Sequence, residues 1–181
     1  VEEIASPTGS FVQSGGVHTV GSDGEHVFLA LLGSSDASNF SGSTTTGGTY
    51  TLSKTGSLLI NGSLFVGGLD ITAPQGHASV ADGPGVFNMT GGNLTATDSI
   101  KIWDGPGNAF NFSGGIITTP LLEGPASRFN WTAGTLDYTD SAGLTIGQGQ
   151  FFQSLTLNSG MAIDAPSLTI ATGGTFSPNG G

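Results

Sequence analysis

The sequence predicts an all-β protein, a parallel β-helix or β-solenoid with right-handed coils of about 20 residues. Three observations predict this fold class. Apolar and polar residues alternate with a period of two in many short segments, whereas no segment sustains the 3.6-residue period of a helix. A short motif recurs along the chain. The 32 glycines among 181 residues also argue against helices, because glycine destabilises a helix interior.

The recurring motif consists of an aromatic residue, a polar residue, a bulky residue, Ser or Thr, and one or two small residues that include Gly. It is most regular in the Phe-Asn-Met-Thr-Gly-Gly segment that begins at Phe87. Each copy is followed by further alternating stretches, so a unit holds two or three short strands. The copies lie at residues 11–16, 50–56, 87–92, 110–115 and 129–134, with a degenerate copy at 155–160.

The spacing of the copies determines the expected coil length. The anchor aromatics Phe87, Phe110 and Phe129 are separated by 23 and 19 residues. The first three anchors are 39 and 37 residues apart, which fits either an extra coil or an insertion. A unit of this size cannot bury its apolar face alone, so it must stack on its neighbours, and roughly eight coils would form a rod about 40 Å long.

Two parts of the chain depart from the regular repeat. Residues 1–10 precede the first copy, and we expect them to form an N-terminal strand or arm that can pair with a neighbouring subunit. Residues 11–181 form the predicted solenoid, interrupted near 33–48 by a Ser-, Gly- and Thr-rich segment that we interpret as an insertion. Gly pairs and Gly-Pro pairs are expected at the corners between strands, because glycine adopts positive φ without a steric penalty.

Charge and hydropathy exclude two classes of partner. Only 9% of the residues are charged and the net charge is −10, with Lys54, Lys101 and Arg128 as the basic residues. We therefore expect no nucleic-acid partner. The apolar run at residues 27–32 is too short to cross a bilayer, so no membrane insertion is expected. Low Lys content with high Gly, Ser and Thr content favours a secreted, extracellular protein.

One polar column is expected on the outer surface. Asn88, Asn111 and Asn130 occupy the same position in three successive copies, so their amides are expected to form a hydrogen-bonded ladder. All three also lie in glycosylation sequons, which are used in hosts that have the machinery. Coils about 5 Å apart leave little room for neighbouring glycans, so the ladder is the favoured interpretation. The other sequons are at Asn39, Asn61 and Asn93.

A second column of acidic residues is expected at the corners. Asp82, Asp104 and Glu123 precede Gly-Pro pairs at spacings of 22 and 19 residues. Stacked carboxylates with loop carbonyls are a ligand set for Ca²⁺. The nonapeptide pattern of calcium-binding solenoids is missing from the sequence, so we interpret these acids as solvated turn residues and expect neither metal nor cofactor.

A stripe of aromatic residues is predicted to form the core, because its members alternate with polar neighbours at the period of a strand. Trp103, next to a corner, is the aromatic residue whose burial the pattern supports least. The stripe comprises Phe11, Tyr50, Phe87, Phe110, Phe129 and Phe176.

No constellation of residues predicts catalysis, and we do not expect an enzyme. Glu25 with His26 and Asp137 with Asp140 are the tight pairs of titratable residues, and neither has a third group at a recognisable spacing. A polysaccharide lyase or hydrolase on a β-helix is therefore the least favoured function. The histidines, too dispersed for a metal trio, are His18, His26 and His77.

The regular copies resemble the autotransporter-associated β-strand repeats and the passenger-type β-solenoid segments of large secreted bacterial surface proteins. The resemblance is carried by residues 87–92, 110–115, 129–136 and 168–181, and it covers most of 9–181. It implies an exported parallel β-helix used for adhesion or scaffolding. The family supplies no catalytic residues.

The two ends of the sequence suggest how such a protein would be used. Residues 174–181 match the first half of another copy, and no capping segment is recognised at either end. We therefore expect a structural extracellular protein whose copies stack head to tail, through open solenoid ends, into a filament or matrix fibre. The alternative is a fragment of a long cell-surface adhesin with a glycan-binding flank.

Overall fold

The computed structural model describes residues 2–3, 8–20, 27–29, 47–69, 80–81 and 84–180. Over this part of the chain the protein is all-β with mostly parallel sheets, which confirms the predicted class at that level. The described residues contain no α-helix, and they include one short 3₁₀ helix, η1 (Ala126–Arg128).

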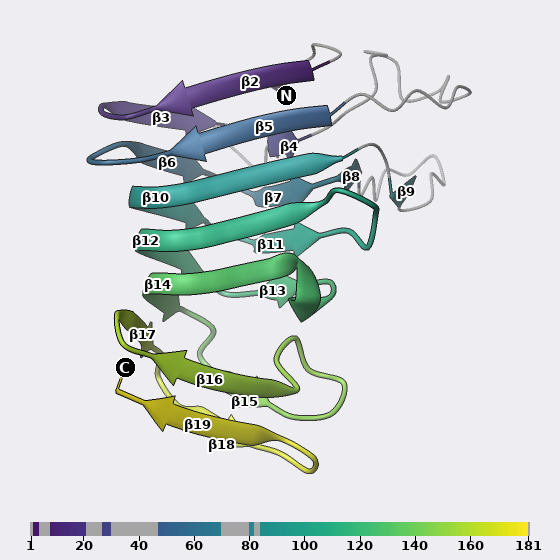
Figure 1. The fold of residues 1–181 in the computed structure, drawn as a ribbon, viewed down its shortest axis with the longest axis vertical. Helices are drawn as coiled ribbons and strands as arrows, with labels where there is room; N and C mark the ends of the chain where they lie inside the picture. The colour runs from purple at the N-terminus through teal and green to yellow at the C-terminus, as the bar shows by residue number, and fades with distance from the viewer. Residues whose placement is uncertain are drawn as a thin grey trace.

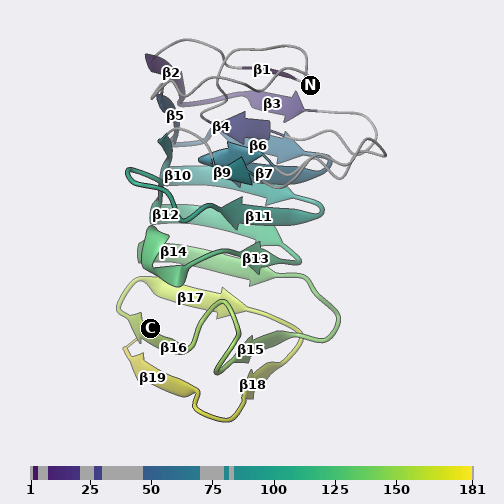
Figure 2. The ribbon, with the colours of Figure 1, turned by 90° about the vertical axis from the view of Figure 1, so that its right-hand side faces the viewer.

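The strands form two larger parallel sheets and three strand pairs, stacked along the long axis of the molecule (Figures 1 and 2). The eight-stranded sheet contains β2 (Thr8–Gln13), β3 (Val17–Val20), β5 (Gly47–Leu52), β6 (Ser57–Ile60), β10 (Gly85–Ala96), β12 (Ala109–Thr119), β14 (Phe129–Tyr138) and β17 (Met161–Asp164). The five-stranded sheet contains β1 (Glu2–Glu3), β4 (Val27–Leu29), β7 (Ser63–Val66), β11 (Ser99–Ile102) and β13 (Leu122–Glu123). One strand pair is antiparallel and joins β8 (Gly68–Leu69) to β9 (Val80–Ala81). The other two pairs are parallel. They join β15 (Leu144–Ile146) to β18 (Leu168–Ile170) and β16 (Ser154–Asn158) to β19 (Thr175–Asn179).

The anchor aromatics lie side by side in consecutive strands of the eight-stranded sheet. Phe11 pairs in register with Tyr50, and Tyr50 pairs with Phe87. Phe87 pairs with Phe110, which pairs with Phe129. We call the passage of the chain from one anchor strand to the next a rung.

The register decides between the two interpretations of the long intervals. Because Phe11, Tyr50 and Phe87 are direct neighbours in the sheet, the intervals of 39 and 37 residues each hold one rung with added residues and no extra coil. The expected coil of about 20 residues applies to the rungs that start at Phe87 and Phe110, and also to the one that starts at Leu155, which pairs with Phe176. The predicted insertion near 33–48 lies outside the described residues up to position 46, whereas Gly47 and Gly48 already belong to β5.

The described part of residues 1–10 forms strands at the N-terminal end of the stack, and its pairing with a neighbouring subunit stays a prediction. Glu2 and Glu3 pair with β4 of the same chain, and Thr8 is the first residue of β2. The backbone groups on one side of each of these strands are thus paired within the chain. The physical reason is that parallel pairing with the next rung satisfies their polar groups locally.

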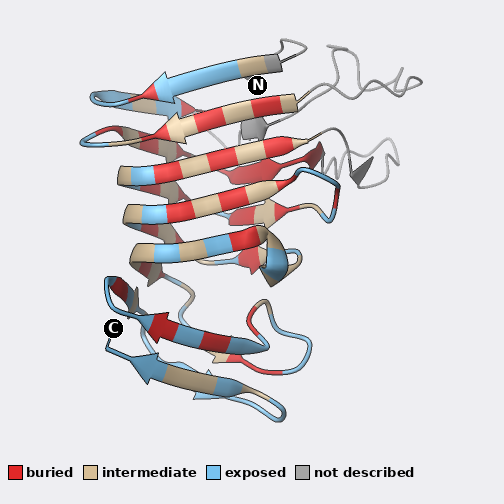
Figure 3. Ribbon diagram, in the orientation of Figure 1, coloured by how far each residue is buried: buried red, intermediate tan, exposed pale blue. Residues whose placement is uncertain are grey.

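The core lies between the sheets. Buried residues alternate along β5, β6, β10 and β12, whereas all four residues of β7 are buried. In β10 the buried residues are Phe87, Met89, Leu94 and Ala96, and the residues between them are half-buried or exposed. Figure 3 shows the same alternation along β5 and β12. Each buried Leu or Phe contributes about 1.5–3 kcal/mol of transfer free energy, so a rung is stabilised mainly by the rungs above and below it.

A column of glycines lets the strands bend in the middle of the eight-stranded sheet. The register shifts within β10 and β12 fall at their Gly-Gly pairs. Gly92, Gly115 and Gly134 have positive φ there. A Cβ on Gly92 would overlap the carbonyl oxygen of Gly56, and one on Gly115 would overlap that of Gly92. The backbones of neighbouring rungs therefore approach too closely at this corner for any side chain.

Candidate functional site

The predicted asparagine column forms one continuous hydrogen-bonded ladder along the sheet. The Nδ2 atom of Asn111 donates to Oδ1 of Asn88 at 2.8 Å. In the next step, Nδ2 of Asn130 donates to Oδ1 of Asn111 at 2.8 Å. The exposure of these side chains increases from half-buried at Asn88 and Asn111 to exposed at Asn130. The ladder therefore uses one amide hydrogen and one carbonyl oxygen at each step and leaves the Oδ1 atom of Asn130 at its open end.

The aromatic stripe is stacked through the centre of the molecule. Tyr50 and Phe87 are parallel, with ring centroids 5.3 Å apart, and Phe87 and Phe110 are 4.8 Å apart. Phe110 and Phe129 follow at 5.3 Å with a tilt of 39°. Phe11 lies 5.0 Å from Tyr50.

The two end members of the predicted stripe differ from the central members. Phe11 is 37% exposed, whereas its register partner Tyr50 is fully buried. Phe176 is half-buried and pairs with Leu155, so an aliphatic residue occupies the anchor position beside it. Phe11 and Phe176 are more exposed because each lies in an outermost rung, which has a neighbour on one side only.

The acidic column is not formed as expected. Glu123 pairs in register with Lys101, three residues before Asp104. Asp104 instead accepts from the guanidinium of Arg128 at 3.3 Å, on the surface. Asp82 lies outside the described residues. The shared position before a Gly-Pro pair did not produce alignment, because the corners differ in length from rung to rung.

No group of three or more His, Cys, Asp or Glu side chains in the described part of the chain is arranged to hold a metal ion. Of the residues considered for catalysis, Glu25, His26 and His77 lie outside the described ranges. Asp137 accepts from the hydroxyl of Thr118 at 3.1 Å. Burial, with a smaller contribution from the charge of Asp140, raises the pKa of Tyr138 above its usual value. The Thr118 contact joins Asp137 of β14 to the neighbouring strand β12.

The remaining sequons are distributed differently from the ladder. Asn93 is exposed at the bend of β10, and Asn61 is half-buried in the turn between β6 and β7. Asn39 lies outside the described residues. The side chains of Asn111 and Asn130 donate to the ladder, so a glycan on either nitrogen would compete with a hydrogen bond.

Trp103 packs against backbone at the corner after β11. A Cβ on Gly68 would overlap Cδ1 of the indole, so the ring lies against this glycine. The Nζ atom of Lys101 is 4.6 Å from the ring centroid, a cation–π distance. The indole Nε1 atom is buried without a hydrogen-bond partner in the structure. Trp103 is therefore half-buried, with one part of its ring against Gly68 and its indole nitrogen covered.

Asn108 is a structural residue that the sequence analysis missed. It is 2% exposed, and its Oδ1 accepts from the backbone nitrogen of Gly85 at 2.8 Å. Its Nδ2 donates to the carbonyls of Trp103 at 3.0 Å and Gly67 at 3.3 Å. The signal in the sequence was an Asn placed between a Gly-Pro-Gly corner and a repeat, since Asn side chains commonly satisfy turn backbone.

A polar cluster replaces apolar core at the N-terminal rung, and sequence reasoning missed it as well. Gln13 takes the position that Leu52 holds in the next rung and is 7% exposed. Its Nε2 atom donates to the carbonyls of Gly16 and Ser57, both at 3.0 Å. Tyr50 donates its hydroxyl to Oε1 of Gln13, and Nδ1 of His18 lies 3.3 Å from that hydroxyl. The signal was a glutamine at the bulky position of the motif.

Apolar side chains become exposed at the C-terminal end of the stack. Leu168 and Ile170 are 40% and 47% exposed. Their register partners Leu144 and Ile146 are 4% and 0% exposed. The same kind of position is thus buried within the stack and uncovered at its end.

Comparisons with known proteins identify no relative of this chain. No protein-family model matches the chain, and no curated protein or solved structure matches it. In the described residues, no helix has the length and hydropathy needed to cross a membrane.

Proposed function

We propose that this chain is a right-handed β-solenoid segment with a structural role, a rod-like element of a secreted fibre or cell-surface protein. The observation that carries the proposal is the continuous Asn88, Asn111 and Asn130 ladder, which crosses three rungs paired in parallel register. A ladder of identical amides stabilises stacked strands along one axis. Such an arrangement gives extension and stiffness and needs no ligand. We propose no catalytic role.

The proposal includes association of the rods end to end. Leu168 and Ile170 at one end and Phe11 at the other are exposed at positions that are buried one rung further in. Strands β2 and β19 each pair on one side within the described structure, which leaves a strand edge at each end. Another rung on each end would bury these side chains and pair these edges. That rung is either a second copy or the next part of a longer chain.

The test is negative-stain electron microscopy together with sedimentation velocity over a range of concentrations. We expect filaments or concentration-dependent oligomers. We expect the double variant Leu168→Asn, Ile170→Asn to lose them, because polar ends no longer gain from burial. The matched control is Ile116→Asn, which changes an apolar residue that is 44% exposed on the flank of β12 and leaves the ends intact.

Short rods that stay monomeric at every concentration would reject end-to-end assembly of separate copies. They would favour the alternative, a segment of a long adhesin whose neighbours are covalent. Equal loss of assembly in the Ile116→Asn control would place the contact on the flank and reject the end-to-end geometry.

A further inference from the structure

The pairing between consecutive rungs changes abruptly after β14. The register of β12 with β14 extends from Phe110 to Thr119. The register of β14 with β17 covers only Gly134 to Asp137. Strand β16 pairs with β19, and β15 pairs with β18, so the later strands pair mainly among themselves. We call residues 144–180 the C-terminal layer, and its boundary with β14 the seam.

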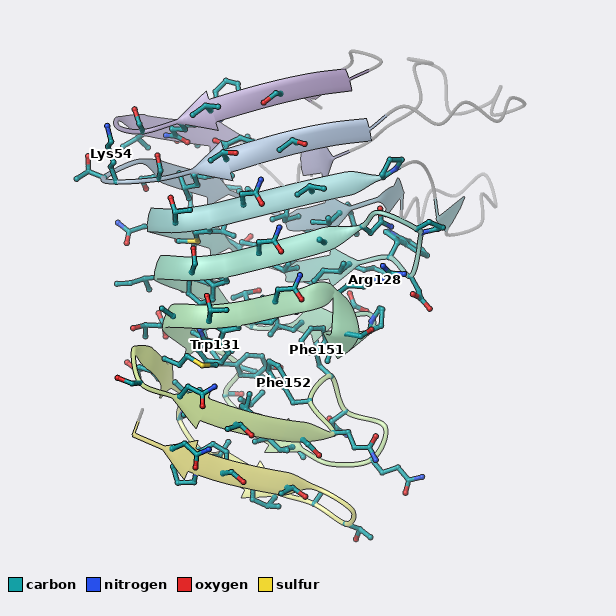
Figure 4. The ribbon with its side chains drawn as sticks, in the orientation of Figure 1. Lys54, Arg128, Trp131, Phe151 and Phe152 are labelled. Carbon is teal, nitrogen blue, oxygen red and sulfur yellow. The ribbon has the colours of Figure 1, made fainter. Side chains whose placement is uncertain are left out.

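Aromatic side chains occupy the part of the seam where strand pairing is missing. Figure 4 shows Trp131, Phe151 and Phe152 between β14 and β16. The ring of Phe129 contacts Phe151 and Phe152 edge-on, at centroid distances of 5.8 Å and 6.1 Å. Trp131 has its Nε1 atom buried without a partner. Rings therefore separate β14 from β16 where backbone hydrogen bonds would otherwise join them.

The short ladder that does cross the seam carries a like-charge pair. Asp137 of β14 and Asp164 of β17 are direct register partners. Neighbouring strands are about 4.8 Å apart, and like charges directly opposite each other destabilise a strand pair. The nearest basic residue in the sequence is Arg128, and no Lys or Arg follows it. Asp137 is also bonded to Thr118 on the other side, which holds it in the main stack.

The outermost strands of the C-terminal layer bury few side chains. All three residues of β18 are exposed, and β19 is exposed or half-buried. The buried apolar residues of the layer lie nearer the seam and are Leu144, Ile146, Phe152, Leu155, Leu157 and Met161. The backbone nitrogen of Gly134 donates to the carbonyl of Gly160 across the seam. Regions with few buried contacts open at a lower free energy than the rest of a structure.

We propose that the C-terminal layer opens from the main stack as one cooperative unit, and that the Asp137 and Asp164 pair determines how readily it opens. Strands β10, β12 and β14 stay folded in the open state. The opening uncovers the β14 edge from Phe129 to Ala133. Because the repulsion is electrostatic and near the surface, neutralising Asp164 or raising the ionic strength closes the seam.

Native-state hydrogen exchange of the full chain tests this proposal. We expect the amides of β16 and β17 to exchange through one common opening that leaves β10 and β12 protected. We expect Asp164→Asn to slow exchange in β17 by about two- to fivefold, the range that removal of one like-charge cross-strand pair implies. High salt is expected to slow exchange in the wild type and to have a smaller effect in the variant.

The matched control is Asp98→Asn, which removes the same charge from an exposed position in the turn between β10 and β11. It is expected to leave exchange in β17 unchanged. Exchange of β17 and β12 through a single global opening would overturn the cooperative unit. Equal effects of Asp98→Asn and Asp164→Asn would overturn the role of the acidic pair.

Discussion

Asn108 and Asn111 have the same side chain, but they bond to different parts of the molecule. Asn108 is buried and bonds only to backbone groups, which belong to three different turns and strand ends. Asn111 is half-buried and bonds to the side chains of Asn88 and Asn130. Removing the hydrogen-bond partner of a buried backbone group lowers the free energy of unfolding more than removing the partner of a group that water can reach.

We therefore expect Asn108→Ala to destabilise the protein by about 3 kcal/mol, because one NH group and two carbonyls lose their partner. Asn111→Ala is the matched control and is expected to cost about 1 kcal/mol. Urea denaturation followed by circular dichroism compares the two variants. Equal costs would show that the Asn108 contacts are no more important than one step of the ladder.

At the scale of the strand, the glycine corner determines how closely successive rungs approach. Strands β10 and β12 run through this corner as single strands because their Gly pairs bend without ending the pairing. The sequence motif predicted glycine at a corner, but it did not predict that each glycine faces the backbone of the rung before it. Contact between backbones excludes every side chain, including alanine.

Substitutions at two glycines distinguish the free-energy cost of a positive φ from the cost of a steric clash. Gly115 has φ +96 and a backbone oxygen where a Cβ would have to lie, whereas Gly149 has φ +79 and nothing within 4 Å of that position. We expect Gly149→Ala to cost about 1 kcal/mol and Gly115→Ala about 3 kcal/mol or more. Thermal denaturation measures both. A cost for Gly115→Ala no larger than that for Gly149→Ala would show that the rungs can separate at the corner.

For the whole molecule, the contribution of a side chain depends on its rung. Each rung contacts only its neighbours, so stability is approximately a sum over adjacent pairs of rungs. A central ring is covered on both sides, and a ring at the end is covered on one. The Gln13 cluster and the exposed Leu168 and Ile170 show how differently the two ends are built.

This dependence predicts different costs for the same substitution. Phe87 is fully buried between Tyr50 and Phe110, whereas Phe11 is 37% exposed. We expect Phe87→Ala to cost about 3–5 kcal/mol and Phe11→Ala about 1 kcal/mol. Guanidinium denaturation of the two variants provides the comparison. Similar costs would mean that the end ring is covered in solution, as it would be in an assembly of several copies.

Much of the stack could be predicted because its signals are local. Alternation at period two identified the inward residues of β10 and β12, and the shared motif position identified Asn88, Asn111 and Asn130 as a column. The acidic column could not be predicted in the same way. Glu123 lies beside Lys101 because the corners have unequal lengths. The number of residues between two acids does not show which path the chain takes between two strands.

By itself, the sequence determined the all-β class, the parallel pairing between copies and the inward residues of the central strands β10 and β12, because these follow from hydrophobic periodicity and from burial shared by neighbouring copies. The tertiary structure alone decided the register across the long intervals, the backbone bonds of Asn108 and the seam after β14. These features depend on contacts between residues far apart in the chain, which no local pattern encodes. The number of residues in each corner determines which residues of neighbouring rungs lie side by side. Side-chain packing then determines whether two rungs are joined by paired strands or by aromatic rings.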